Sequence, residues 1–387
     1  MMKENIDYNQ NKFLMFVLDK MAYEYEQDGK DVIRMTLGKS ELPLHENITN
    51  AMVDALMDFK KSTLVFPPGL PQLQVKLSEF YRENNKLDIK PSNIIISTGT
   101  STIFRNLFYL LLNEGDEVLL PIPYYSLYKF SAILCGVKIR YYKIDTKTLK
   151  LDRESFEQNF TSKTKIVVIN TPGNPLGNIL SKDDLLFMDS VVDGQATIIN
   201  DEIYSNMCFD EPGTSVLELD GIKSQFITTN SFSKGYRMYS RRVGYCIVPD
   251  ELVTPLTVIQ HHTLLTTDPV VQFGAIAALD HQDEVTYLRN LYKSRRDYTV
   301  EEFSDVKDVK AIHSKGGFYL TLECSQFMKK HNIKTSLDLA VKIMEKTNVA
   351  TVPGSDFGLP ETIRLSYTCI KYNEGINRMV DFFKHYK

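Results

Sequence analysis

The stretch from Asn230 to Tyr245 reads N-S-F-S-K-G-Y-R-M-Y-S-R-R-V-G-Y, and the rest of the chain can be understood as a frame around its Lys234. Apolar runs at 226–229 and 243–248 flank it, which predicts that it connects two strands. A loop at the end of a strand can hold a lysine amine in a cleft instead of leaving it at the surface.

The neighbours of Lys234 suit phosphate recognition. Ser231 and Ser233 supply hydroxyls, and Arg242 supplies a planar guanidinium. An amine beside a phosphate-binding set suggests a phosphorylated aldehyde held as a Schiff base. Local composition alone favours the alternative, a solvated basic turn.

The composition of the chain excludes several classes of protein. The chain has 387 residues, 43% apolar and 24% charged, with a net charge of −4, which gives no electrostatic reason to bind nucleic acid or an anionic membrane. Its five cysteines are odd in number and form no C-x-x-C pair, which argues against a disulfide framework or a metal site. No signal-peptide pattern or membrane-length apolar run occurs. We expect a soluble cytoplasmic protein that acts on a small molecule.

From about residue 92 the chain alternates short apolar runs with helical patterns, which predicts a mostly parallel α/β sheet. The expected strands are 94–96, 117–120, 138–144, 165–169, 197–199, 226–229 and 243–248. Further expected elements are a strand at 32–37 and helices at 12–28, 48–59, 72–83, 102–112, 124–134, 181–189, 255–263, 284–305 and 336–346. We expect an N-terminal arm over 1–47, a large α/β domain over 48–285 and a small α+β domain over 286–387.

Small polar residues follow the first expected strand of this sheet. Gly99, Thr100 and Ser101 lie where a helix begins, and free N–H groups there favour an anion, although a Ser/Thr helix cap is an equal reading. Asn174 lies in a Pro/Gly-rich turn after the strand at 165–169 and could present its amide to a ligand or serve the turn alone.

The strand at 197–199 leads into Asp201 and Tyr204, at the carboxyl end where open α/β sheets build their sites. A helix cap is the alternative for Asp201. Tyr124 and Tyr125 also follow a strand, and either could stack on a planar cofactor or simply pack.

In order along the chain, these motifs resemble those of the class I/II aminotransferases, enzymes of fold type I that use pyridoxal 5′-phosphate (PLP). The resemblance spans about 35–372. It rests on G-T-S, P-I-P-Y-Y, N-x-x-x-N-P-x-G, D-E-I-Y, S-x-S-K with an arginine eight residues later, G-G-F-Y, P-G-S-x-F-G and R-L-S-Y. It implies an aminotransferase that moves an amino group between an amino acid and a 2-oxo acid, with an active site at a homodimer interface.

The resemblance also implies roles. Lys234 would form the Schiff base and shuttle a proton, Asp201 would face the pyridine nitrogen, and Tyr204 and Asn174 would bond the ring oxygen. Arg364 would bind the substrate carboxylate, in a site that Asn174 and the Gly38 backbone also border. Tyr125 would stack on the ring, and the phosphate would be held by Gly99, Thr100, Ser101, Ser231, Ser233 and Arg242.

The sequence departs from the family pattern at three places. No tyrosine occurs in 63–68, where the family usually has one that reaches the partner's phosphate; Gly235 replaces Ser or Thr; and Ser240-Arg241 replaces a small pair. The missing tyrosine puts the contact with the partner's phosphate in doubt. The changes at Gly235 and Ser240-Arg241 could alter the reaction outcome, so a PLP-dependent lyase, cyclase or oxidase is one alternative, and a non-catalytic effector-binding domain is another. His261 and His262 are expected to pack or be solvated near the interface.

Overall fold

The computed structural model describes residues 12–386, and its centre is a seven-stranded sheet with the order β2-β8-β7-β6-β5-β3-β4. β8 runs antiparallel to both of its neighbours, and the other pairs are parallel. The strands are β2 (Ile94–Ser97), β3 (Glu117–Ile122), β4 (Lys138–Lys143), β5 (Thr164–Asn170), β6 (Thr197–Asp201), β7 (Gln225–Ser231) and β8 (Gly244–Ile247).

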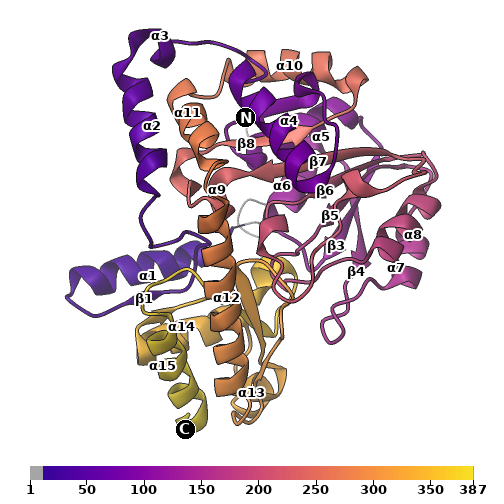
Figure 1. The fold of residues 1–387 in the computed structure, drawn as a ribbon. Coiled ribbons are helices and arrows are strands. Elements are labelled where there is room, and N and C mark those ends of the chain that lie inside the picture. The colour runs from indigo at the N-terminus through magenta and orange to yellow at the C-terminus, as the bar shows by residue number, and fades with distance from the viewer. Residues whose placement is uncertain (1–11, 387) are drawn as a thin grey trace, which may run out of the picture.

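Helices cover both faces of this sheet because its strands are apolar on both sides (Figure 1). Along β5, Ile166 and Val168 pack in one hydrophobic cluster, whereas Val167 and Ile169 pack in another, as strand alternation requires. The covering helices are α4 (Pro71–Asn85), α5 (Thr100–Leu111), α6 (Ser126–Cys135), α7 (Arg153–Asn159), α8 (Lys182–Val192), α10 (Asp250–Leu264) and α11 (Pro269–Ala278).

A smaller sheet of order β12-β13-β10-β9 lies at the other end of the molecule (Figure 1). Its strands are β9 (Lys310–Ala311), β10 (Tyr319–Glu323), β12 (Val352–Pro353) and β13 (Thr362–Ser366). The helices that accompany it are α12 (Gln282–Phe303), α13 (Ser325–Lys330), α14 (Ser336–Thr347) and α15 (Tyr372–His385).

The N-terminal part of the chain joins this smaller half. β1 (Ile33–Arg34) pairs in parallel with β11 (Val349–Ala350), and α1 (Met15–Gln27) lies beside them. From there the chain passes to α2 (Glu46–Met57) and α3 (Phe59–Ser62), which stand at the edge of the large half (Figure 1).

All seven predicted strands of the central sheet are present, so the predicted mostly parallel seven-stranded α/β fold is confirmed. The strand expected over 32–37 is shorter, because only Ile33–Arg34 finds a pairing partner. The expected loop at Lys234 is instead a single helical turn, α9 (Phe232–Gly235). Within residues 12–386, no helix is both long and apolar enough to cross a membrane.

Candidate active site

Lys234 lies on α9, at the carboxyl end of β7, and its amine is enclosed by protein. The residue is only 7% exposed, and its Nζ donates a hydrogen bond of 2.7 Å to the carbonyl oxygen of Gly38. A Cβ at Gly38 would lie 2.7 Å from that Nζ, so the approach requires glycine. Burial lowers the pKa of the amine, which makes the unprotonated, reactive form more available.

Asp201 ends β6, the strand beside β7, and is also buried. Its carboxylate accepts hydrogen bonds from Tyr128 Oη at 2.6 Å and from the backbone N of Ile203 at 3.2 Å. Burial raises the pKa of Asp201 to about 6 even though these hydrogen bonds favour ionisation. A cationic group placed against this carboxylate would therefore stabilise its charged form.

Arg242 and the start of α5 form a cradle for an anion. A Cβ at Gly99 would lie 2.4 Å from Nη2 of Arg242, and Gly99 has a φ of +73°. α5 begins at Thr100, and no side chain caps its N-terminus, so the first N–H groups are available to a ligand. A guanidinium beside a helix N-terminus is an arrangement that binds phosphate well.

Arg364, on β13, brings a second guanidinium to the site and is only 2% exposed. It donates to Oδ1 of Asn174 at 3.1 Å and to the carbonyl oxygen of Thr36 at 2.6 Å, whereas its Nε has no hydrogen-bond partner. The rings of Tyr319 and Phe357 lie 3.9 and 4.6 Å from its Cζ. A buried cation held only by neutral groups favours the binding of an anion such as a carboxylate.

Tyr319 is a site residue for which the sequence predicted no role. Its hydroxyl forms hydrogen bonds with the amine of Lys234 and the hydroxyl of Tyr204. Burial opposes ionisation of this phenol, but the charges of Lys234 and Arg364 lower its pKa below the ordinary value. The G-G-F-Y motif contained the residue, but the signal that places it is tertiary: Thr321, two residues along β10, pairs with Arg364 on β13.

These side chains converge on one cavity of about 230 Å³. Among the residues predicted for the site, the cavity brings together Gly38, Thr100, Ser101, Tyr125, Asn174, Asp201, Tyr204, Ser233, Lys234, Arg242 and Arg364. Gly99 lies behind the guanidinium of Arg242. Tyr124, the alternative stacking residue, does not line the cavity and instead stacks on Tyr141.

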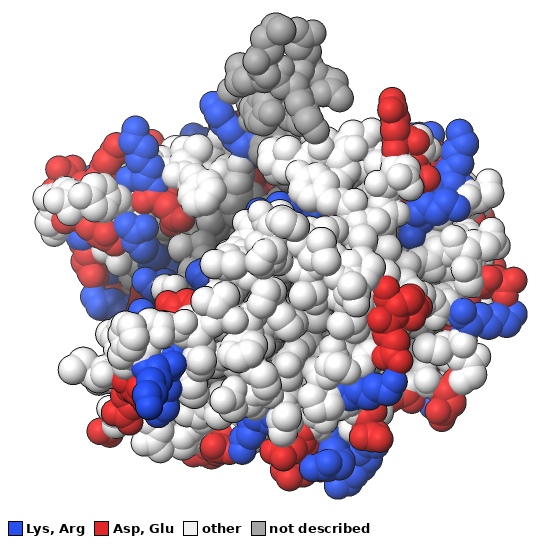
Figure 2. Space-filling model, turned by 90° about the horizontal axis from the view of Figure 1, so that it is seen from above, with Lys and Arg blue, Asp and Glu red and all other residues white. Residues whose placement is uncertain are grey.

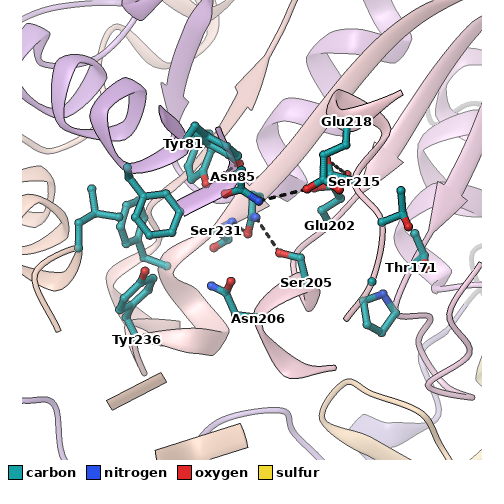
Figure 3. Close-up of a pocket in the computed structure, with 18 residues that line it drawn as sticks. Tyr81, Asn85, Thr171, Glu202, Ser205, Asn206, Ser215, Glu218, Ser231 and Tyr236 are labelled. Atoms are coloured by element: carbon teal, nitrogen blue, oxygen red, sulfur yellow. Dashed lines mark hydrogen bonds between the residues drawn. The ribbon is translucent and has the colours of Figure 1, made fainter. Parts of the chain in front are cut away.

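Ser231 is placed outside this lining. Its Oγ accepts a hydrogen bond of 3.0 Å from the backbone N of Ser233, which makes it the N-cap of α9, and it also bonds the carbonyl oxygen of Val243. Ser231 faces a separate cavity of about 110 Å³, in which Glu202 accepts a hydrogen bond from Ser215 (Figure 3). The two serines of S-x-S-K therefore lie on different cavities.

The charges of the larger cavity fit PLP together with a substrate carboxylate. Its lining contains three cations, Lys234, Arg242 and Arg364, and Asp201 is the one carboxylate that the described part of the chain contributes. Two anionic groups, a phosphate near Arg242 and a carboxylate near Arg364, would balance this excess. Lys234 and Asp201 remain for the aldehyde and the ring nitrogen of the cofactor.

Comparisons with known proteins agree with this chemistry. The family model for aminotransferase class I and II matches residues 30–383. An aspartate aminotransferase of Bacillus sp. (strain YM-2) is 30% identical over 372 residues, and the match covers 94% of each chain. A probable aspartate/prephenate aminotransferase of Aquifex aeolicus is 31% identical over 370 residues, with 92% of each covered.

A solved aspartate aminotransferase from Thermotoga maritima superimposes with a TM-score of 0.85 at 28% identity, covering 95% of this chain and 96% of that one. The shared fold and the nearly complete family match lead to one assignment. The chain belongs to the class I and II aminotransferase family.

Proposed function

We propose that this chain is a PLP-dependent aminotransferase that transfers an amino group between an amino acid and a 2-oxo acid. One observation carries the proposal: the buried amine of Lys234 shares a single cavity with the buried carboxylate of Asp201 and the guanidinium of Arg364, which no carboxylate of the described lining neutralises. A nucleophilic amine, a partner for a ring nitrogen and a receptor for a carboxylate are the groups that such a reaction needs.

The cofactor would be held at three points. The phosphate would be bound by Arg242, by Ser233 and by the N–H groups that begin α5 at Thr100 and Ser101. Asp201 would face the ring nitrogen, and Asn174 and Tyr204 would bond the ring oxygen. Tyr125 lines the same cavity and would cover one ring face. When bound, PLP supplies an aldehyde that condenses with amines and a ring that withdraws electrons from Cα.

The protein's own groups would then hold the substrate and move the proton. Arg364 would bind the α-carboxylate through the side of its guanidinium that includes the unpartnered Nε. Lys234, whose amine has a lowered pKa, would take a proton from the substrate Cα and donate it to the cofactor carbon C4′. Tyr319 would position that amine through the hydrogen bond between them.

The departures that motivated a lyase, cyclase or oxidase lie away from this cavity. A Cβ added at Gly235 would meet Asn206 and Val285, and Ser240 and Arg241 are exposed. The relatives compared above are aminotransferases and give no support to those alternatives. The non-catalytic alternative has no support either, because the reactive lysine is present and buried.

We also propose a homodimer, because apolar side chains are exposed around α2 and α3. Leu56, Met57 and Phe59 are 63, 81 and 78% exposed, which is more than a monomer ordinarily leaves in one place. The face seen from the side of α3 and α10 is largely uncharged in its middle (Figure 2). The three-part division at 47/48 and 285/286 and a cytoplasmic location remain proposals.

Absorbance spectroscopy of the purified holo-protein tests the proposed reaction. We expect a visible absorbance band that an amino acid diminishes and a 2-oxo acid restores, since the amino group is transferred in two half-reactions. Lys234→Ala should lose the band, whereas Lys223→Ala, at an exposed lysine paired with Asp193, should keep it. A holo-protein whose spectrum no amino acid alters would contradict the proposal.

A further inference from the structure

Apart from Tyr125, which would cover one face of the cofactor ring, one wall of the cavity around Lys234 has no role in the proposed reaction. Five residues line both this cavity and an adjoining space of about 550 Å³. All five are apolar or aromatic: Phe13, Met15, Leu37, Tyr125 and Tyr239. We call this set the shared wall.

We infer that the shared wall receives the substrate side chain and that the chain selects amino acids with a bulky, uncharged, apolar side chain. The inference rests on the proposed transamination, because it concerns the substrate of the same site. It differs from what the names of the compared relatives suggest, since those enzymes are named for aspartate.

Arg364 and the shared wall line the same cavity, so a substrate held by its α-carboxylate at Arg364 has the wall within the same enclosed space. The ring of Phe357, 4.6 Å from Cζ of Arg364, is buried and supports the wall from behind. Phe13 packs edge-on against Phe357, with their ring centroids 6.2 Å apart. Met15 and Leu37 belong to the same hydrophobic cluster. Apolar packing through Phe357 therefore connects Arg364 to the shared wall.

Phe13 is fixed at this wall by its neighbours in the chain. The carboxylate of Asp356 accepts hydrogen bonds from the backbone N of Leu14 at 2.8 Å and of Met15 at 2.9 Å. This holds the start of α1 against the 3₁₀ turn Gly354–Phe357. The wall is thus a built surface, in which two separate parts of the chain meet.

Within one chain, residues 12–386 place no further cation in the cavity for a side-chain carboxylate. Lys234, Arg242 and Arg364 are the three cations that the described residues place in its lining, and each already has a role in the proposed reaction. Lys12 and Lys129 line only the adjoining space, so an acidic side chain would have to cross the shared wall to reach them. Contact with the shared wall would stabilise a bound apolar side chain, whereas burying an acidic side chain there without a cation would cost free energy.

Calorimetry of the holo-protein tests this inference without depending on turnover. The two probes are 3-phenylpropanoate and succinate, which share one carboxylate for Arg364 and differ at the other end. We expect 3-phenylpropanoate to bind at least about tenfold more tightly than succinate, since the phenyl group buries apolar area at the shared wall. Equal or tighter binding of succinate would overturn the inference.

Two variants test whether the shared wall causes the difference in affinity between 3-phenylpropanoate and succinate. Phe13→Ala should weaken the binding of 3-phenylpropanoate by about tenfold, whereas Tyr23→Ala, at an exposed residue of α1, the helix that follows Phe13, should not change it. Leu37→Arg adds a cation at the wall and should reverse the preference towards succinate. An unchanged preference in both Phe13→Ala and Leu37→Arg would also overturn the inference.

The outcomes separate this inference from the proposed function. A holo-protein that prefers 3-phenylpropanoate but shows no spectral change with any amino acid would contradict the transamination and support the apolar wall. A protein that transaminates and prefers succinate would support the reaction and contradict the selectivity.

Discussion

Asn174 accepts a hydrogen bond of 3.1 Å from Arg364, which connects the turn after β5 of the large sheet to β13 of the small sheet. The same guanidinium donates to the carbonyl oxygen of Thr36. Three distant parts of the chain therefore set the direction in which Arg364 faces the cavity. Its planar fork is suited to two parallel hydrogen bonds with a carboxylate.

Arg364→Lys should lower kcat/KM for the amino acid by about 100-fold, mainly through KM, because lysine cannot keep these contacts and also bind a carboxylate with two N–H groups. Steady-state kinetics measures this. Arg82→Lys, at an exposed position, is the matched control. An unchanged KM for Arg364→Lys would show that the carboxylate binds elsewhere.

Gly99→Ala should weaken PLP binding, since the new Cβ would lie 2.4 Å from Nη2 of Arg242 and displace the guanidinium. Gly115→Ala is the matched control: Gly115 also has a positive φ, of +91°, but nothing lies within 4 Å of its Cβ position. Both variants should lose about 1 kcal/mol of stability from backbone strain. Only Gly99→Ala should raise the Kd for PLP, by about tenfold or more, in a fluorescence titration.

Tyr319→Phe should shift the acid limb of the pH profile of kcat to lower pH. The phenol raises the pKa of Lys234 by its charge interaction and hydrogen bond, so its removal lowers the pKa at which the amine becomes a base. Rates measured between pH 5 and 10 test the shift. Tyr109→Phe, at a half-exposed residue, should leave the profile unchanged, and a profile that Tyr319→Phe does not move would contradict the positioning role.

Glu202→Gln should make stability less dependent on pH. Burial raises the pKa of Glu202 from 4.5 to about 7, so the folded protein binds this proton more tightly than the unfolded chain does. Stability must then fall as pH rises from about 4.5 to 7, by up to about 3 kcal/mol, because the unfolded chain ionises first. Glutamine can still accept the hydrogen bonds from Ser215, Val216 and Asn200 but cannot ionise.

Urea unfolding at pH 5 and pH 8 measures this difference for the wild type and Glu202→Gln. Glu157→Gln, at an exposed residue of α7 outside this cavity, is the control and should follow the wild type. If Glu202→Gln loses as much stability between the two pH values as the wild type, Glu202 is not the titrating group.

Much of this architecture could be predicted from the sequence because its signals are local. The run I-V-V-I in β5 is apolar on both sides, as a strand covered by helices on both faces must be. Asp201 ends β6, and Lys234 and Asn174 lie a few residues after β7 and β5, so the strand ends bring the three side chains together at one edge of the sheet.

The other features of the site depend on contacts between segments that are far apart in the sequence. The contact of Arg364 with Thr36 joins residues 328 positions apart, and that of Lys234 with Gly38 joins residues 196 apart, so no periodicity could reveal them. Ser231 faces another cavity than Ser233 because it ends a strand, whereas Ser233 belongs to the helical turn that follows. A turn of four residues is too short to produce a helical pattern.

The pairing of Gly38 with Lys234, and of Thr36 with Arg364, also bears on the order in which the enzyme is made. Thr36 and Gly38 are synthesised before the strands of the large sheet, and Arg364 is synthesised after all of them. A nascent chain that contains the whole large sheet still lacks its carboxylate receptor and the β10 phenol beside the lysine. The active site can therefore be complete only after β13 has been synthesised and has packed against the N-terminal segment that carries Thr36 and Gly38.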